Sequence, residues 1–379
     1  MKRKVIGIVT VCALISAGYL AFTVVDSQTP VAVAAKEKYG ATVYVAGMGG
    51  HFAKADITID PSDAKNPIKM ENLGRVTIGM KKTHPTHDAR IDNRDSNVLF
   101  WSTYKRDPQG KMHVGKSDLK TGEVITDVAL TPHEKAPGKK GPLYCASGQN
   151  KKYYMPVFMG TEGYIDVFDK KSMKLKKRVF VTDMGYKPGT YKFVHGINSP
   201  DMKKFLVVIN QAGPDGKGNG KVDFILVKMS SLVKGKWKVL AKNTLTGEPN
   251  KTLTFRQYFS NDGKRIYQSA ADRMWVLDGK TLKLIDEKMS VEEGSQIHDV
   301  MPTPDDKYAL LTVRLATEAI DAQGKEMDKD ITDGVLYLYD SASKKIVGNP
   351  VSTCLGCHKD VGLGDKSAVL CGLDATWKN

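Results

Sequence analysis

The chain has 379 residues, with 57 Lys and Arg against 42 Asp and Glu, and a formal net charge of +15. Its basic residues are scattered through predicted turns, as in Lys81-Lys82 and Lys151-Lys152. A nucleic-acid-binding surface would instead cluster them with aromatic residues on one face, so this class is not favoured. Dispersed lysines are typical of solvated surfaces and also suit an acidic partner or an anionic substrate.

The first 35 residues predict an export signal. Met1-Lys2-Arg3-Lys4 is a basic start, the run Val5–Val25 is largely apolar, and Ala32-Val33-Ala34 resembles a cleavage site. An uncleaved N-terminal anchor is the alternative, because the apolar run is long for a signal peptide. Both interpretations predict a periplasmic or extracellular protein.

From residue 36 to about 350 the sequence repeats a β-rich unit. An apolar strand is followed by a polar turn, a second strand, a third strand and a fourth. The turns use Pro, Asp, Gly and Asn, which suit tight β-turns. Comparable first-strand segments lie near residues 87–92, 142–147, 194–199, 255–260 and 297–302. Four strands that recur every forty to sixty residues predict an all-β protein with β-propeller blades.

The blades can be counted from these repeats. The segment 41–46 resembles a second strand that lacks an inner partner, and residues 367–373 near the C-terminus are predicted to supply it. Propellers often close in this way because it removes a sheet edge. The count is then six blades, with seven as the alternative.

Several inner strands carry a histidine just ahead of the turn. His87, His195 and His298 have this position, and Arg256 matches it in another repeat. If inner strands begin at one face, these side chains converge at the mouth of the central channel, with His84 in the preceding loop. The cluster is a candidate distal haem ligand, second cofactor or metal site, or substrate site, and Arg256 a candidate anion contact. His51, His113 and His133 look like loop residues without a role.

The repeats resemble the YVTN family of secreted β-propellers, and Ala41-Thr42-Val43-Tyr44-Val45-Ala46 is the segment nearest to that motif. A histidine just ahead of the turn is similar to the haem-binding propeller of cytochrome cd-type nitrite reductases. The resemblance covers most of residues 40–348 and implies a secreted propeller that carries haem.

The segment 351–379 contains the most specific motif of the chain, Cys354-Leu355-Gly356-Cys357-His358. C-x-x-C-H is the attachment signature of c-type haem: Cys354 and Cys357 bind the porphyrin covalently, and His358 is the proximal iron ligand. A zinc site or a redox dithiol are the alternatives for two cysteines at this spacing. The two remaining cysteines after the leader, Cys145 and Cys371, either form a disulfide or are separate buried thiols.

These features predict an exported monohaem c-type cytochrome on a propeller scaffold, which exchanges electrons with a partner protein of acidic docking surface. One alternative is an oxidoreductase whose central histidines hold a second cofactor, a metal ion or a small substrate. Another is a non-catalytic binding or sensor propeller with haem. Met48, Met80 and Met301 are further candidate axial ligands. Hydrolase and nucleotide-binding motifs are absent from the sequence.

Overall fold

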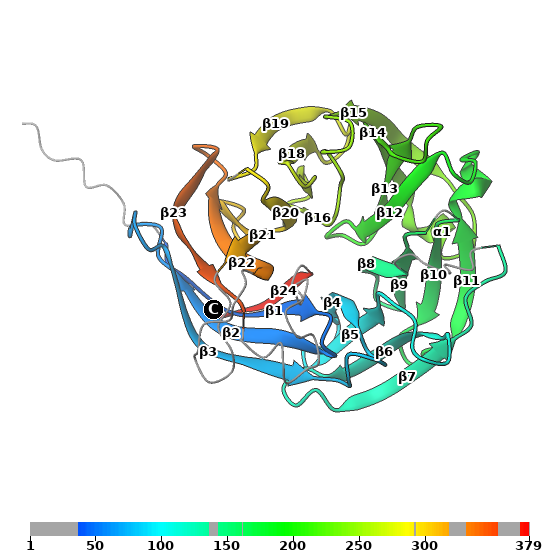
Figure 1. The fold of residues 1–379 in the computed structure, drawn as a ribbon, viewed down its shortest axis with the longest axis horizontal. Coiled ribbons are helices and arrows are strands. Elements are labelled where there is room, and N and C mark those ends of the chain that lie inside the picture. Colours follow the sequence, from blue (N-terminus) through cyan, green and yellow to red (C-terminus); the bar gives the residue numbers. More distant parts are fainter. Residues whose placement is uncertain are drawn as a thin grey trace, which may run out of the picture. The chain divides into compact units, whose positions relative to one another are not determined.

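The computed structural model describes residues 37–135, 143–160, 162–291, 293–317, 331–354 and 372–378. In these residues the chain forms six four-stranded antiparallel sheets, arranged as blades around a central axis (Figure 1). The predicted six-bladed β-propeller is therefore confirmed, and the alternative of seven blades is wrong. Within the described residues the helices are single turns, α1 (Met229–Leu232) and the 3₁₀ turn Val181–Met184.

The strands of each blade follow one another in sequence from the channel outwards, except in blade one, whose inner strand comes from the C-terminus. Blades one to three contain β24 (Leu373–Lys378), β1 (Tyr39–Gly47), β2 (His51–Ile59), β3 (Ile68–Thr77); β4 (Thr86–Ile91), β5 (Val98–Thr103), β6 (Met112–Asp118), β7 (Val124–Leu130); and β8 (Tyr144–Gln149), β9 (Tyr153–Phe158), β10 (Tyr164–Asp169), β11 (Leu175–Phe180). Blades four to six contain β12 (Tyr191–Asn198), β13 (Lys204–Ala212), β14 (Gly218–Lys228), β15 (Val239–Thr246); β16 (Gln257–Phe259), β17 (Arg265–Ser269), β18 (Arg273–Asp278), β19 (Leu284–Met289); and β20 (Gln296–Pro302), β21 (Tyr308–Thr317), β22 (Ile331–Asp340), β23 (Lys345–Ser352).

The core of the described residues consists of six hydrophobic clusters, one between each pair of neighbouring blades. Inner strands are buried on both faces, as β8 is along its whole length, because blades pack on either side of them. The outer strands β7, β15 and β19 alternate between more and less exposed residues, since only one of their faces meets a neighbour. Burial of apolar surface thus stabilises the ring as a closed set of interfaces.

The turn after the inner strand is built in the same way in three successive blades. Ser199, Ser260 and Thr303 each donate a side-chain hydrogen bond to an aspartate two residues later, at 2.6, 2.7 and 2.9 Å. A hydroxyl that bonds a nearby carboxylate fixes a tight turn locally. This is why the recurring polar turn is visible in the sequence as a repeat.

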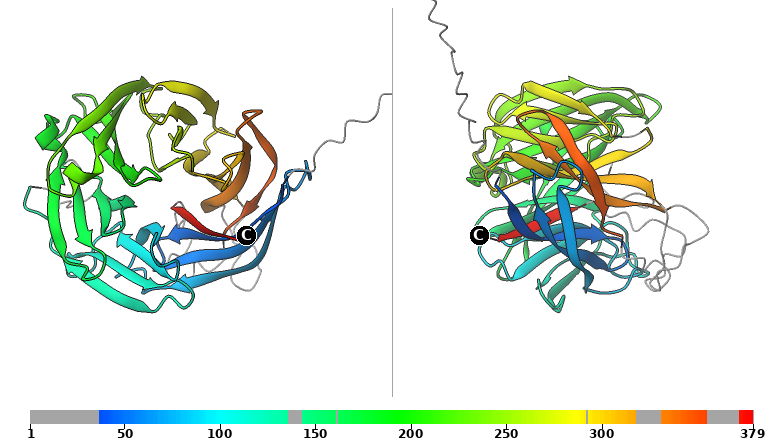
Figure 2. Two further views of the ribbon diagram at one scale, coloured as in Figure 1. Left: turned by 180° about the vertical axis from the view of Figure 1, so that it is seen from behind. Right: turned by 90° about the vertical axis from the view of Figure 1, so that its left-hand side faces the viewer.

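The propeller closes through its C-terminal strand. β24 pairs antiparallel with β1, with Leu373 opposite Val45 and Lys378 opposite Gly40, and the two lie side by side in both views of Figure 2. The expected closure is confirmed, but the closing strand is 373–378 and not 367–373, of which residues 367–371 lie outside the described part. Among the described residues after Cys354, the fully buried Leu373 is the first that packs in the cluster between blades six and one.

A chain that ends at Gly372 tests this closure without removing the C-x-x-C-H motif. We expect its free energy of unfolding to fall by at least about 3 kcal/mol, because the buried Leu373 and the pairing of an inner strand are both lost. Urea denaturation measures the change. A chain that ends at Trp377 keeps most of β24 and is the control; equal urea midpoints for both truncations would contradict the closure.

Candidate functional site

Six residues at or near the beginning of the six inner strands surround one end of the channel. They share burial and position, and we refer to them as the channel ring: His87, Cys145, His195, Arg256, His298 and Gly372. The strand register skips a residue at His87, Cys145 and His298, so each is the extra residue of a β-bulge. Bulges re-aim a side chain out of the sheet, which turns these three side chains toward one another.

The contacts within the channel ring are direct. The rings of His87 and His298 lie 5.4 Å apart between centroids, and Cys145 Sγ lies 3.6 Å from His87 Nδ1. The His298 ring stacks on Phe255 at 4.2 Å, and His87 packs on Tyr104 at 4.3 Å. The structure thus brings together the histidines that the sequence placed at equivalent positions.

Arg256 fills the channel below the histidines. Its guanidinium donates to the carboxylates of Asp88 and Asp299 and to the carbonyl oxygens of Cys145 and His87. The expectation that Arg256 holds an external anion is therefore corrected, because the anions that it meets are two buried aspartates of the protein itself. Burial alone would raise the pKa of Asp88, but Arg256 and Arg90 outweigh it and hold that pKa below its usual value.

The channel ring histidines are neutral at physiological pH. Burial, followed by the positive charge of Arg256, lowers the pKa of His87 and of His195 to about 3. Burial and the nearby Arg314 lower the pKa of His298 well below its usual value. Neutral imidazoles can donate a lone pair to a metal or hydrogen-bond a ligand, so the ring has the protonation state that a binding site needs.

Several buried polar atoms near the ring have no hydrogen-bond partner among the described residues. These are both ring nitrogens of His195, Nδ1 of His298, Nε of Arg314, and Nε and Nη2 of Arg106. An unpaired buried donor or acceptor costs about 1–3 kcal/mol, so groups of this kind in one region indicate that something else bonds them.

The described residues that flank residues 355–371 of the C-x-x-C-H segment lie at this same face. β23 ends beside the start of β22, where Thr353 bonds the carbonyl of Gly334 through both its N–H and its hydroxyl, and Cys354 follows. At the other side of the segment, Gly372 lies against His87 O and Arg256, leaving no room there for a Cβ. Cys357, His358 and Cys371 lie outside the described residues. Cys145 forms no disulfide with any described residue.

The other candidate ligands are placed away from the channel ring. His84 bonds Asp127 on the outer part of blade two. Met301 packs in the cluster between blades six and one, whereas Met80 is 67% exposed. Met48 is a buried residue of the β1–β2 turn. The structure therefore offers no contact of these methionines with the described ring residues.

Sequence reasoning misassigned His113 and His51, and it did not single out Tyr104 or Arg106. His113, expected in a loop, lies in β6, and His51 begins β2. The signal for His113 was the alternation of Met112, Val114 and the polar residues between them, which is typical of a half-buried strand. Tyr104 and Arg106 were missed because they follow a strand without any motif. His133 bonds the backbone of Lys135 and is not part of the ring.

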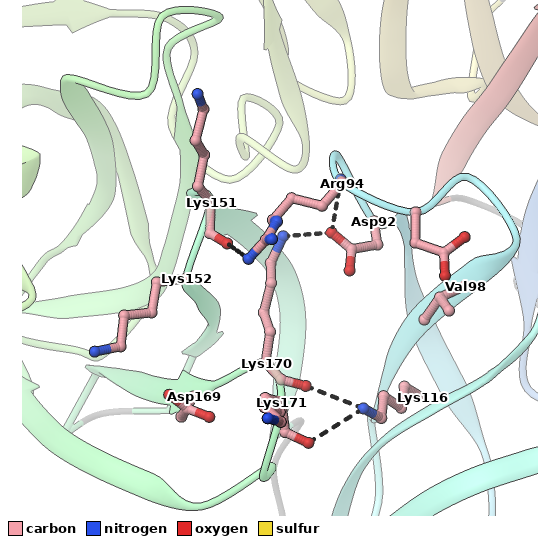
Figure 3. Close-up of a pocket in the computed structure, with 10 residues that line it drawn as sticks. Asp92, Arg94, Val98, Lys116, Lys151, Lys152, Asp169, Lys170 and Lys171 are labelled. Carbon is pink, nitrogen blue, oxygen red and sulfur yellow. Dashed lines mark hydrogen bonds and ion pairs between the residues drawn. The ribbon is translucent and has the colours of Figure 1, made fainter.

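A basic pocket of about 580 Å³ lies at the opposite ends of the inner strands, between blades two and three (Figure 3). Lys170 is bonded there to Asp92, and Lys116 to the backbone carbonyls of Lys170 and Lys171. Of the pocket's cations, Lys170 is therefore paired with a carboxylate of the protein itself. This gathering of lysines is on the far side of the propeller from the channel ring.

No protein-family model and no curated protein sequence matches the chain. Among solved structures, the β-propeller domain of Cps50 (Swd1) from Myceliophteria thermophila is similar at 11% identity and a TM-score of 0.40, over 70% of this chain and 86% of that one. The Dos1 propeller is similar at 13% identity and a TM-score of 0.44, over 80% of this chain and 68% of that one. At these values the likenesses carry no argument about function. In the part of the chain that is described, no helix is both long and apolar enough to cross a membrane.

Arg256→Met tests the importance of the channel ion pairs. We expect it to lower the free energy of unfolding by about 3–5 kcal/mol, because Asp88 and Asp299 would remain buried without their counter-charge. Lys203→Met is the control: Lys203 is 82% exposed and lies 4.0 Å from Asp201, so its loss should change the same quantity by less than about 1 kcal/mol. Equal effects of the two substitutions in urea denaturation would show that Arg256 has no special role.

Proposed function

We propose that the chain is an exported monohaem c-type cytochrome on a β-propeller scaffold, which exchanges electrons with a partner protein. Cys354 and Cys357 would attach the haem and His358 would be its proximal ligand. The observation that carries the proposal is that Cys354 and Gly372, the described residues on either side of this segment, both lie at the face of the channel ring. A cofactor attached between them would be tethered within reach of the buried histidines.

The unpartnered donors of this face support a haem. Arg106 and Arg314 hold buried guanidinium N–H groups without partners among the described residues. Guanidinium groups pair with carboxylates in a bidentate way, and a haem carries two propionate carboxylates. The His195 and His298 imidazoles, neutral and with bare nitrogens, are suited to the remaining axial position. His87 is less suited, since its Nδ1 contacts Cys145.

A haem held in this way would suit electron transfer. Covalent attachment retains the haem through redox cycles, and its burial and axial ligand set the potential. A partner would approach the channel-ring face, where the haem edge would be closest. The basic pocket of Figure 3 lies on the other side, so an acidic partner bound there would be far from the haem.

Covalent attachment is the first test. Haem should remain with the protein after acid-acetone extraction and be visible by haem staining of the denatured chain. Cys357→Ala should weaken attachment, and His358→Ala should change the optical spectrum while both thioether bonds remain. The Cys145→Ala variant is the matched control and should keep haem. Extraction of haem from the wild-type chain would refute the assignment.

The sixth iron position is the second test. We expect a low-spin haem with two histidine ligands, and we expect either His195→Ala or His298→Ala to convert it to high spin in optical and paramagnetic resonance spectra. His84→Ala is the control, because His84 is engaged by Asp127 and should leave the spin state unchanged. A wild-type haem that is already high spin, or a low-spin haem unaffected by both substitutions, would contradict histidine ligation.

A second candidate function is an oxidoreductase in which the channel ring binds a small substrate, a second cofactor or a metal ion. The specific observation in its favour is that His195 lacks a partner at both ring nitrogens, whereas an axial ligand uses only one. This candidate predicts that His195→Ala abolishes binding of a second species and leaves the haem spectrum intact. The outcome of the spin-state test therefore separates the two functions.

A further inference from the structure

A second histidine cluster lies on the outer half of blade two, apart from the channel ring. Its members are His84, in the connection from β3 to β4, His113 of β6 and Asp127 of β7. In the sheet, Gly115 is opposite both Asp127 and Trp101, and His113 is two residues from Gly115. Residues two apart on a strand share a face, so the side chains of His113, Asp127 and Trp101 lie together. His84 packs over them with its ring 5.2 Å from that of Trp101.

The donor atoms converge on one point. His84 Nε2 lies 3.1 Å from Asp127 Oδ2, and His113 Nδ1 lies 2.8 Å from Asp127 Oδ1. One ligand atom from each of the three residues lies within 4.8 Å of the others. Metal–ligand distances of about 2.0–2.2 Å in a tetrahedral site separate ligands by about 3.3 Å. Each imidazole nitrogen is therefore already near this spacing from an Asp127 oxygen, and the widest separation in the cluster, up to 4.8 Å, would shorten by about 1.5 Å to hold an ion.

The outer nitrogen of each imidazole is held by a further group. His113 Nε2 lies 3.0 Å from Asp107 Oδ2, and His84 Nδ1 lies 2.8 Å from Thr83 Oγ1. In metal sites the second nitrogen of a ligating histidine almost always bonds a carboxylate, a carbonyl or water, which fixes the ring and the tautomer. Both imidazoles thus present their inner nitrogens to Asp127 and have their outer ones occupied.

The backbone also makes room for this cluster. A Cβ at Gly79 would lie 2.0 Å from His84 Nδ1, and one at Gly115 would lie 2.2 Å from the Trp101 ring. Glycine at these two positions is what lets the imidazole and its supporting indole approach the chain. The site remains accessible, since the side chains of His84, His113 and Asp127 are 14%, 11% and 30% exposed.

We propose that His84, His113 and Asp127 form a binding site for a divalent transition-metal ion of the Zn²⁺ class. Two imidazole nitrogens and one carboxylate oxygen suit such borderline ions and not Ca²⁺ or Mg²⁺, which prefer all-oxygen sets. Three protein ligands leave at least one coordination position toward solvent. None of the three residues belongs to the segment 351–371 that contains the C-x-x-C-H motif, so the proposal does not depend on the proposed haem.

Zn²⁺ titration of the full-length chain, stripped of metal with a chelator, tests the proposal. Isothermal calorimetry at pH 7.5 should show one equivalent bound to the wild type. We expect His84→Gln and Asp127→Asn each to weaken this binding by about 100-fold or more, because each removes a ligand. Asp107→Asn should weaken it by roughly 10-fold, since it only orients His113. His133→Gln, which removes an imidazole in the connection between β7 and β8, should have no effect.

Thermal unfolding provides the second readout. Excess Zn²⁺ should raise the unfolding temperature of the wild type and of His133→Gln, but not that of His84→Gln or Asp127→Asn, because a ligand stabilises only the state that binds it. Circular dichroism before the titration identifies any variant that fails to fold. Of the two ligand variants, His84→Gln should disturb folding less than Asp127→Asn, because His84 lies in a connecting segment and Asp127 in a strand. The proposal is overturned if the wild type binds no Zn²⁺ at up to about 1 mM, a concentration that corresponds to very weak affinity. It is equally overturned if the His84→Gln/Asp127→Asn double variant binds Zn²⁺ with wild-type affinity, which would locate the ion on other side chains.

Discussion

The buried guanidinium of Arg256 is the interaction on which the rest of the propeller depends. A guanidinium removed from water needs compensating charge and hydrogen bonds on every side. Here the compensation comes from Asp88 of blade two, Asp299 of blade six and backbone carbonyls of blades two and three. Arg256 itself belongs to blade five, so one side chain connects four of the six blades across the channel. This arrangement is possible only when the ring of blades is closed.

The same network reaches the closing strand. Asp299 accepts a hydrogen bond from the backbone N–H of Leu373, and Tyr258 donates to the carbonyl of Leu373. Asp374 in turn accepts from the backbone of Ile91. The inner strand of blade one is therefore held by polar contacts from blades two, five and six as well as by its pairing with β1. Closure of the propeller and organisation of the channel interior therefore depend on the same residues.

The buried ion pairs of Arg256 with Asp88 and Asp299 also affect the environment of the channel-ring histidines. Arg256 and its two aspartates are buried in the channel interior, and the channel-ring histidines are buried next to them. This burial lowers the pKa of His87 and His195 and keeps both imidazoles neutral, which is the form that can coordinate a metal ion. The bulges at His87 and His298 convert residues of ordinary inner strands into inward-facing groups. The inner strands that carry His87 and His298 thus also carry Asp88 and Asp299, the partners of Arg256.

The sequence alone determined the fold class and the principle of closure, because these depend on local signals: the period of the strands, the recurring polar turn and the lack of an inner partner for residues 41–46. It predicted six blades but left seven as an alternative, which the structure excluded. It also indicated that His87, His195 and His298 occupy equivalent positions. In a repeat protein, residues at the same place in each sequence repeat occupy the same place in each blade, so their equivalence can be predicted from the sequence.

The tertiary structure decided what each of these groups meets. Arg256 looked like an anion contact in the sequence, yet its anions are Asp88 and Asp299, which are 168 and 43 residues away. The closing strand began at residue 373 because Leu373 fits the cluster between blades six and one, a property of the partner surface and not of the strand. His84 separated from the channel histidines, and joined His113 and Asp127, because side chains on different strands of blade two share a face only after the sheet has formed. Local sequence patterns specify the strands and turns. Contacts between residues far apart in the sequence depend instead on how the blades pack, and this packing is complete only in the closed ring.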